Sequence, residues 1–281
     1  MEHLNRARPA GRTLIVAAIL AVVALLVPPW LGGLAAANQS NGDGPRPTIV
    51  LVHGDWADAS SWTNVIERLQ RRGYTVVAPP NPLRGPTSDA AYVASFLQTI
   101  PGPVVLVAHS YGGFVITNAA TGNANIKALV YIDAFIPDLG QTLADLAAGS
   151  CIDPETALNF VPVPGGVVDT YLRREANGTY EGFSECFANG VNRQQADVLA
   201  AVQRPAALNQ YVEPSGPPAW ETIPAWSLIG TADNVIPQAQ QQAMSTNAGA
   251  QISTVNAGHL SLITRPNAVI NVIETAVEAT T

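Results

Sequence analysis

A strand that runs directly into a serine is the feature that most constrains this chain. Residues 104–113 read VVLVAHSYGG, an apolar run followed by a serine among small residues. Residues 108–112 fit the pattern G-x-S-x-G, except that alanine stands at the first position. The pattern is typical of a tight turn between a strand and a helix, because bulky neighbours would clash with the serine there. With the helix-compatible residues 114–120 behind it, the segment predicts a strained turn that presents Ser110.

The first 37 residues differ in kind from the rest of the chain. Arginines at positions 6, 8 and 12 precede an apolar run over residues 14–27, and an Ala-Ala-Ala cleavage site precedes Asn38. These are the three regions of a secretory signal peptide. The run is shorter than the roughly 20 residues that span a bilayer, and two prolines end it. We therefore expect a cleaved signal over 1–37 and a secreted, periplasmic or cell-envelope protein. The alternative is an N-terminal membrane anchor.

The charge of residues 38–281 limits the classes of partner that the protein is expected to bind. Loss of residues 1–37 removes three arginines and one glutamate, which changes the formal net charge from −7 to −9. An acidic protein without a basic run is a poor partner for nucleic acid or an anionic membrane surface. We expect neither as a partner once the signal is cleaved, and the composition does not fix an oligomeric state.

After a flexible Gly/Pro-rich leader over 38–47, strand and helix patterns alternate. Such alternation predicts an α/β fold with a mostly parallel, doubly wound sheet in a domain over 48–281. The alternation stops between about 138 and 218, which we interpret as a helical lid inserted over the carboxyl ends of the strands, where such sheets bind ligands. The predicted strands cover residues 48–52, 75–78, 104–108, 127–133, 225–229 and 252–255, and the main helices end at 73, 100, 120, 247 and 277.

The predicted lid contains both cysteines of the chain, Cys151 and Cys186. In an exported protein a pair of cysteines favours a disulfide, although two free thiols remain the alternative. No cluster of histidines and cysteines at ligand spacing accompanies them, so no metal site is expected. A Gly-rich phosphate loop is also lacking, and we expect no cofactor.

A serine nucleophile needs a base, and the base needs an acid that orients it. Three histidines remain after residue 37. His109 adjoins the serine and would project away from it, and His53 directly follows the first strand. His259 follows the last strand in the segment NAGHL, where a loop would bring its imidazole over the strand ends. Elimination therefore favours His259 as the base.

Two aspartates compete for the role of the acid. Asp233 follows the strand over 225–229 in the turn-rich segment GTADN, between the serine and the histidine in chain order. Asp133 ends the fourth strand and is a rival, with a capping or ion-pairing role as its ordinary interpretation. We favour Asp233, because its loop also leads into the next helix.

Acyl transfer further requires two N–H donors for the oxyanion. One is expected from the backbone of Tyr111, directly after the serine. The other is expected from the loop after the first strand, where Gly54 permits a sharp turn and Asp55 offers its backbone N–H, with Trp56 as the alternative. A carboxylate beside an oxyanion is unusual, so the side chain of Asp55 is expected to face away or to bond the lid. The side chain of Trp56 is a candidate for the substrate pocket.

The chain resembles the α/β-hydrolase superfamily over residues 48–278, and within it a bacterial branch of small lidded esterases. The resemblance implies Ser110 as nucleophile, Asp233 as acid, His259 as base, and the amides of Asp55 and Tyr111 as the oxyanion hole. Many members carry glycine in place of Ala108 and a small apolar residue in place of Asp55. The segments that carry the resemblance are LVHGDWADASSW (51–62), AHSYGG (108–113), EPSGPPAW (213–220) and GTADNVIP (230–237).

Together these patterns predict an exported serine hydrolase that cleaves small carboxylic esters through an acyl-enzyme on Ser110. A hydroxynitrile lyase or a cofactor-free perhydrolase on the same triad is the first alternative. Lyases of this fold usually add a lysine near the pocket, but the one lysine, Lys127, begins a strand at the far end of the sheet. A non-catalytic binding protein on this scaffold is the second alternative, which the retention of all three triad candidates disfavours.

Overall fold

The computed structural model describes residues 45–178 and 180–280, which belong to the compact unit Gly44–Thr281. The predicted signal peptide and most of the predicted leader lie outside the described residues. Within the part that is described, no helix is both long and apolar enough to cross a membrane.

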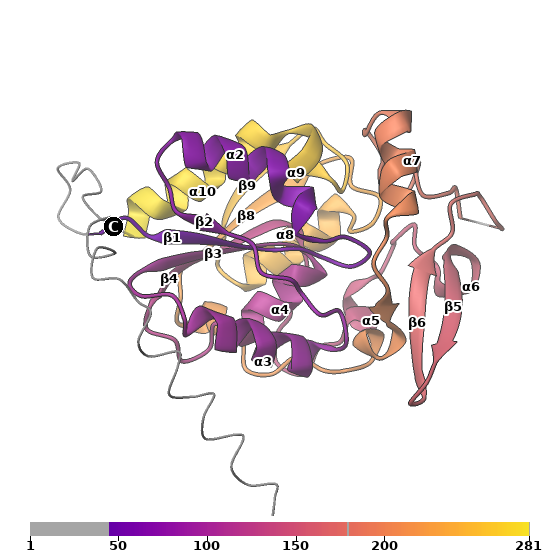
Figure 1. The fold of residues 1–281 in the computed structure, drawn as a ribbon, viewed down its shortest axis with the longest axis horizontal. Helices are drawn as coiled ribbons and strands as arrows, with labels where there is room; N and C mark the ends of the chain where they lie inside the picture. The colour runs from indigo at the N-terminus through magenta and orange to yellow at the C-terminus, as the bar shows by residue number, and fades with distance from the viewer. Residues whose placement is uncertain (1–44, 179, 281) are drawn as a thin grey trace, which may run out of the picture. The chain divides into compact units, whose positions relative to one another are not determined.

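Six parallel strands form the central sheet, in the order β2-β1-β3-β4-β8-β9 (Figure 1). The predicted parallel α/β fold is confirmed, and every predicted strand is present. β1 and β3 are registered so that Val52 pairs with Ala108, which places the loop after β1 beside the loop after β3. The strands are β1 (Thr48–Val52), β2 (Val76–Val77), β3 (Val104–Ser110), β4 (Ile126–Ala134), β8 (Ala225–Gly230) and β9 (Gln251–Val255).

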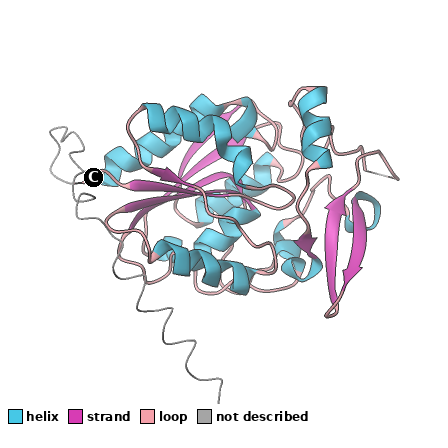
Figure 2. Cartoon of the chain, in the orientation of Figure 1, coloured by secondary structure: helices cyan, strands magenta, loops and turns pink. Residues whose placement is uncertain are grey.

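Helices cover both faces of this sheet (Figures 1 and 2). α2 (Thr63–Arg71) and α10 (Pro266–Thr280) pack on one face, together with the short α9 (Ser261–Thr264). α3 (Pro86–Leu97) and α4 (Tyr111–Ala119) pack on the other, and α8 (Gln238–Asn247) contacts β8 and β9. The apolar stripe of α10 shows why it docks there, because residues at spacings of three and four are its buried ones: Val269, Ile270, Val272, Ile273, Ala276 and Val277.

The segment between β4 and β8 is the insertion, which stands beyond the carboxyl ends of the strands (Figure 1). We predicted helices here from the sequence. The structure adds a small antiparallel sheet, β5-β6-β7, that we did not predict. Four of the six residues of β5 are exposed, so no alternation of apolar side chains marks it. The elements are α5 (Leu143–Leu146), α6 (Pro154–Ala157), β5 (Leu158–Val163), β6 (Val167–Leu172), α7 (Arg193–Ala201) and β7 (Ala206–Ala207), followed by the short turns η3 (Leu208–Tyr211) and η4 (Ala219–Glu221).

A signal for the β5–β6 hairpin does exist in the sequence. Val163 pairs with Val167 across the three residues Pro164-Gly165-Gly166. Both glycines have positive φ, 96° and 81°, which side chains with a Cβ rarely adopt. A Pro-Gly-Gly turn between two valine-containing runs is thus the local pattern that indicates this hairpin.

Candidate active site

Ser110 stands at the junction of β3 and α4 in a strained conformation. Its φ of 53° and ψ of −128° lie outside the regions that residues with a Cβ ordinarily occupy. A Cβ added at Gly112 would lie 2.7 Å from the carbonyl oxygen of Val52. One added at Gly54 would lie 2.6 Å from the Cβ of Ser110. Both positions therefore require glycine, and the turn predicted from the sequence holds Ser110 at the head of α4.

The imidazole of His259 lies against the serine hydroxyl. His259 follows β9, and its Nε2 is 3.0 Å from Ser110 Oγ. Its Nδ1 is 2.8 Å from Oδ2 of Asp233, which follows β8. The structure thus brings together the three side chains that the sequence placed after three different strands, in the order serine, histidine, acid that activates a hydroxyl.

Donors from two elements hold Asp233 in place. Its Oδ1 accepts the backbone N–H groups of Val235 (2.8 Å) and Ile236 (2.9 Å), and Oδ2 accepts Nε2 of Gln241 in α8 (2.8 Å). Burial raises the pKa of Asp233, and these hydrogen bonds oppose that shift. Gln241 was not predicted from the sequence, because a helical glutamine carries no signal of the group it will meet.

Burial also sets the charge of His259. The side chain is fully buried, and burial lowers its pKa to about 3. The imidazole is therefore neutral near pH 7, so Nε2 has a free lone pair for the proton of Ser110. Once protonated, the ring would be stabilised by the carboxylate of Asp233 at Nδ1.

Asp133, the rival acid, has other partners. Its Oδ1 accepts the N–H of Gly230 (2.7 Å), and its Oδ2 accepts the N–H of Ser261 (3.2 Å). Neither oxygen hydrogen-bonds His259 within the described part of the chain. Asp133 thus ties the end of β8 to the start of α9, and Asp233 is the carboxylate that contacts the imidazole.

The other two described histidines support the loops around the site. His109 does not contact the hydroxyl of Ser110 by a hydrogen bond; its Nε2 lies 2.9 Å from the backbone carbonyl of His259. His53 accepts the N–H of Asn81 at Nε2 (2.9 Å), which fastens the loop after β1. Sequence elimination removed both from the role of base but did not reveal that His109 supports the histidine loop.

The two predicted N–H donors belong to the residue next to Ser110 in the chain and to the loop that approaches it. Tyr111 is the first residue of α4, where an N–H has no partner within the helix. The loop after β1 passes so close that a Cβ on Gly54 would lie 3.1 Å from Ser110 Oγ, and Asp55 follows directly. Among residues 45–178 and 180–280, neither N–H has a hydrogen-bond acceptor. Two free donors beside a serine hydroxyl suit an anionic oxygen.

The insertion contributes a polar contact that the sequence did not reveal. Nδ2 of Asn189 donates to the carbonyl of Ala232 (2.6 Å), and its Oδ1 accepts the N–H of His259 (3.3 Å). Asn189 therefore bridges the loop that carries the acid and the loop that carries the histidine. A Cβ on Gly258 would collide with Asn189, so glycine is required there as well.

A disulfide fixes this part of the insertion. Cys151 and Cys186 are bonded, with their Cα atoms 5.8 Å apart. The N–H of Cys151 donates to the carbonyl of Asn234 (2.8 Å), the residue after the acid. The disulfide thus joins the two stretches of the insertion that lie against the loops of Asp233 and His259.

Comparison with known proteins identifies the family of this fold. The alpha/beta hydrolase family pattern matches residues 49–272. The chain belongs to the alpha/beta hydrolase family. A carbendazim hydrolyzing esterase of Nocardioides sp. (strain SG-4G) is 31% identical over 126 residues, which is 40% of this chain and 52% of that protein. The match therefore spans about half the length of this relative.

Solved alpha/beta hydrolases share the fold at low identity. A pyrethroid hydrolase from Sphingobium faniae JZ-2 superposes with a TM-score of 0.63 at 19% identity, over 83% of this chain and 98% of that one. An extracellular alpha/beta-hydrolase from a Paenibacillus species gives 0.64 at 22% identity, over 82% and 98%. The relatives named above are an esterase and two hydrolases, and the two solved structures show that the fold is shared.

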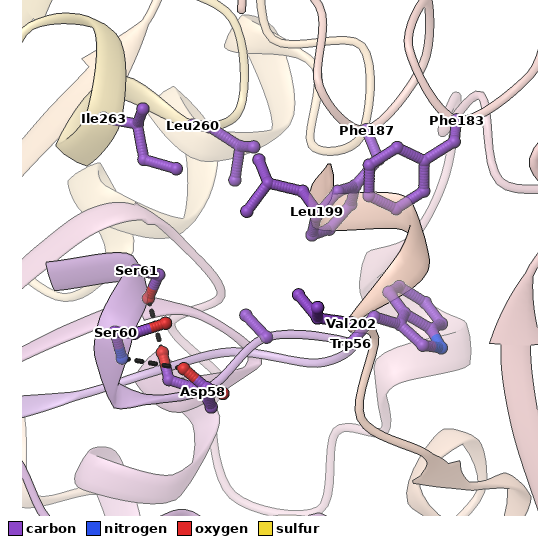
Figure 3. Close-up of a pocket in the computed structure, with 11 residues that line it drawn as sticks. Trp56, Asp58, Ser60, Ser61, Phe183, Phe187, Leu199, Val202, Leu260 and Ile263 are labelled. Carbon is purple, nitrogen blue, oxygen red and sulfur yellow. Dashed lines mark hydrogen bonds between the residues drawn. The ribbon is translucent and has the colours of Figure 1, made fainter. Parts of the chain in front are cut away.

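An apolar cleft is lined by Phe187 and Leu260, two neighbours of His259 (Figure 3). Leu199 of α7 and Val202, the residue after this helix, face the turn Asp58–Ser61 across it. The ring of Phe187 lies 5.4 Å from that of His259 and 5.9 Å from that of Trp56, so one aromatic ring separates the cleft from the histidine. Trp56, the predicted pocket residue, lines the cleft and donates Nε1–H to the carbonyl of Thr170 (3.2 Å). The apolar lining consists of Trp56, Ala57, Phe183, Phe187, Leu199, Val202, Leu260 and Ile263.

The lysine of the chain lies at the opposite end of its strand from the serine. Lys127 lies at the amino end of β4, is exposed, and donates to the carbonyl of Ala124 (2.8 Å). No group of three or more His, Cys, Asp or Glu side chains that could hold a metal is found among the described residues.

Proposed function

We propose that this protein is an exported serine hydrolase that cleaves carboxylic esters through an acyl-enzyme on Ser110. The observation that carries the proposal is the Ser110–His259–Asp233 chain, with contacts of 3.0 and 2.8 Å and a neutral imidazole in the middle. The esterase relatives support the same reaction class.

In the first half of the reaction Ser110 Oγ attacks the ester carbonyl while Nε2 of His259 takes its proton. The developing oxyanion accepts the N–H groups of Asp55 and Tyr111. His259 then gives the proton to the leaving alcohol oxygen, and Asp233 stabilises the charged ring in between. A water molecule activated by the same imidazole hydrolyses the acyl-enzyme. The alcohol therefore leaves on the side of the site where His259 stands.

We place the cleft in Figure 3 on that side, since Leu260 of its lining directly follows His259 and Ile263 lies in α9, the helix after it. We assign it to an apolar alcohol group of the ester, with Trp56 and Phe187 at its inner end. Two of its polar side chains already have backbone partners: Asp58 Oδ1 accepts the N–H of Ser60 (2.7 Å), and Ser61 Oγ donates to the carbonyl of Asp58 (2.7 Å). Most of the remaining lining is apolar.

Hydrolysis of p-nitrophenyl esters from acetate to palmitate tests the reaction. We expect turnover by the purified protein and a fall in kcat of about 10⁴-fold or more in Ser110→Ala, because triad members act as a unit. Ser95→Ala, which changes an exposed serine of α3, is the matched control and should retain full activity. A loss of less than tenfold in Ser110→Ala would remove this serine from the mechanism, and silence of the folded protein on every ester would contradict ester hydrolysis.

Export is tested separately. The full chain should be cleaved in a bacterial host, and N-terminal sequencing of the product should begin at Asn38. Recovery of an uncleaved chain in the membrane fraction would support the anchor instead.

A further inference from the structure

Asp55 carries a buried carboxyl group for which the reaction above has no use. The residue is 5% exposed, and its Oδ1 is buried with no hydrogen-bond partner in the described part of the chain. The expectation that this side chain bonds the lid is therefore wrong for Oδ1. Burying a polar atom without a partner costs about 1–3 kcal/mol. Such an atom beside a nucleophile is a group that a ligand can satisfy.

A second carboxyl group nearby shows the contrast. Asp89 accepts the hydroxyl of Tyr111 (2.8 Å), the backbone N–H groups of Arg84 (3.0 Å) and Gly85 (3.3 Å), and the hydroxyl of Ser88 (3.4 Å). Burial raises the pKa of Asp89, and these four donors oppose that shift. Asp55 has no such donors, and burial together with the nearby Asp89 raises the pKa of Asp55 well above its usual range, while Arg84 opposes the shift.

The guanidinium of Arg84 is the cation that opposes the pKa shift of Asp55, but it already has other partners. It contacts Asp169 (2.6 Å) and the carbonyl of Pro205 (3.0 Å). Tyr211, in η3 of the insertion, faces the same region, since burial and the Asp55 carboxyl both raise its pKa. A buried carboxyl group without a donor or a cation partner favours its protonated form, which can donate one hydrogen bond and accept another.

Asp89 and Tyr111, which lie near Asp55, belong to α3 and α4, helices on the opposite face of the sheet from α9, the helix that follows His259 (Figure 1). The alcohol leaves toward His259, which precedes α9. In the bound ester the oxyanion lies at the two N–H donors and the alcohol oxygen lies at the histidine. We therefore expect the acyl chain to extend toward the third side of the site, where Asp55 lies.

We propose that the Asp55 carboxyl determines specificity by hydrogen-bonding a neutral polar substituent, a hydroxyl, oxo or amide group, on the acyl part of the ester close to the scissile carbonyl. The inference rests on the ester-hydrolase function proposed above. An acyl chain without such a group leaves the buried carboxyl unpaired, and sites built around a hydrogen bond reject analogues that lack it.

The test compares 4-nitrophenyl butyrate with its 3-hydroxy and 3-ammonio analogues, which share one leaving group. For each enzyme the readout is the ratio of kcat/KM for the substituted ester to that for butyrate. We expect Asp55→Ala to lower the hydroxybutyrate ratio about tenfold or more, the effect of one buried hydrogen bond. Asp55→Asn should keep most of the ratio, because a carboxamide also donates and accepts. Glu67→Gln, an exposed change in α2, should leave the ratio as in wild type.

Three results would overturn the inference. The hydroxybutyrate ratio could be the same in wild type and Asp55→Ala. Asp55→Asn could lose as much as Asp55→Ala, which would assign the effect to loop structure. The ammonio ester could be preferred in wild type alone, which would make Asp55 an ionised site for cations.

A binding experiment separates this inference from the proposed reaction. The 4-nitroanilides of the same acids are measured by calorimetry in Ser110→Ala, alone and combined with Asp55→Ala. Asp55 should favour the hydroxy anilide over the plain one about tenfold even if no ester is hydrolysed, and equal affinities in both proteins would refute the specificity role.

Discussion

The parallel sheet and the insertion are held together by different means. Every residue of β3 is buried, whereas four of the six residues of β5 are exposed. Eight large apolar side chains are exposed among the described residues, and all but Tyr92 lie in the insertion: Leu139, Phe160, Val161, Val167, Val198, Val202 and Val212. The sheet is therefore stabilised by burial of apolar surface, and the insertion depends more on its disulfide and on single polar contacts.

The proposed catalytic groups belong to the sheet region, and the groups that shape access to them belong to the insertion. Ser110, Asp233 and His259 all stand on loops anchored by the sheet, while Phe187 and Asn189 reach them from the insertion. We expect changes in the sheet loops to abolish turnover, and changes in the insertion to alter stability or to reduce turnover by small factors.

The largest effect is expected from the acid. Asp233→Asn should lower kcat about 10⁴-fold, because an amide cannot hold the imidazole in the tautomer that accepts the serine proton. Asp133→Asn should lower kcat less than tenfold but lower the free energy of unfolding by about 1–3 kcal/mol, since one buried N–H loses its acceptor. Steady-state kinetics and denaturant unfolding of both variants check this. If the ranking of the two kcat values is the reverse, Asp133 is the acid.

The next effect tests the insertion. Replacing Cys151 and Cys186 together by alanine should lower the free energy of unfolding by about 3–4 kcal/mol, as the loop-closure entropy of the unfolded chain predicts for a loop of this length. Limited proteolysis should then cut the variant within 138–218 before any cut in the sheet. Wild type treated with dithiothreitol is the control and should behave as the variant does. An unchanged free energy of unfolding, or first cuts in the sheet, would show that the insertion does not depend on its disulfide for stability.

The smallest effect concerns the contact between the two regions. Asn189→Ala removes two hydrogen bonds that align the acid and histidine loops, and kcat/KM should fall about five- to tenfold. Asn192→Ala is the matched control: its side chain caps α7 by accepting the N–H of Gln195, so its loss should cost stability of about 1 kcal/mol without affecting turnover. Equal losses of turnover in both variants would show that Asn189 acts through the stability of the insertion alone.

The sheet and the triad positions could be predicted because their signals are local. Buried strands such as β1 and β3 are mostly apolar runs. The glycines at positions 54 and 112 follow from the strained turn at Ser110. His259 was reached by elimination among three histidines, and its position after the last strand follows from the topology of a parallel sheet.

The supporting contacts could not be predicted, because they join residues far apart in sequence. Gln241, Asn189 and His109 each bond a triad loop, but nothing near them in the chain indicates that partner. The partnerless carboxyl of Asp55 could be noticed as unusual from the sequence, yet its burial and its lack of donors are properties of the folded loop. The exposed hairpin was missed for the opposite reason, since a strand in solvent carries little apolar periodicity.

The disulfide has a consequence for how ligands come and go. It fixes the insertion beside His259, and the bond from Trp56 to Thr170 fixes β6 beside the loop of Asp55. In the chain, α7 lies between Cys186 and β7, the strand that pairs with β6. Leu199 of this helix and Val202, which follows it, line the wall of the cleft. Both ends of the segment that carries α7 are therefore fixed, and we expect this nine-residue helix to be the part of the cleft wall that moves most easily. The residence time of a product would then depend on how tightly α7 packs against the cleft.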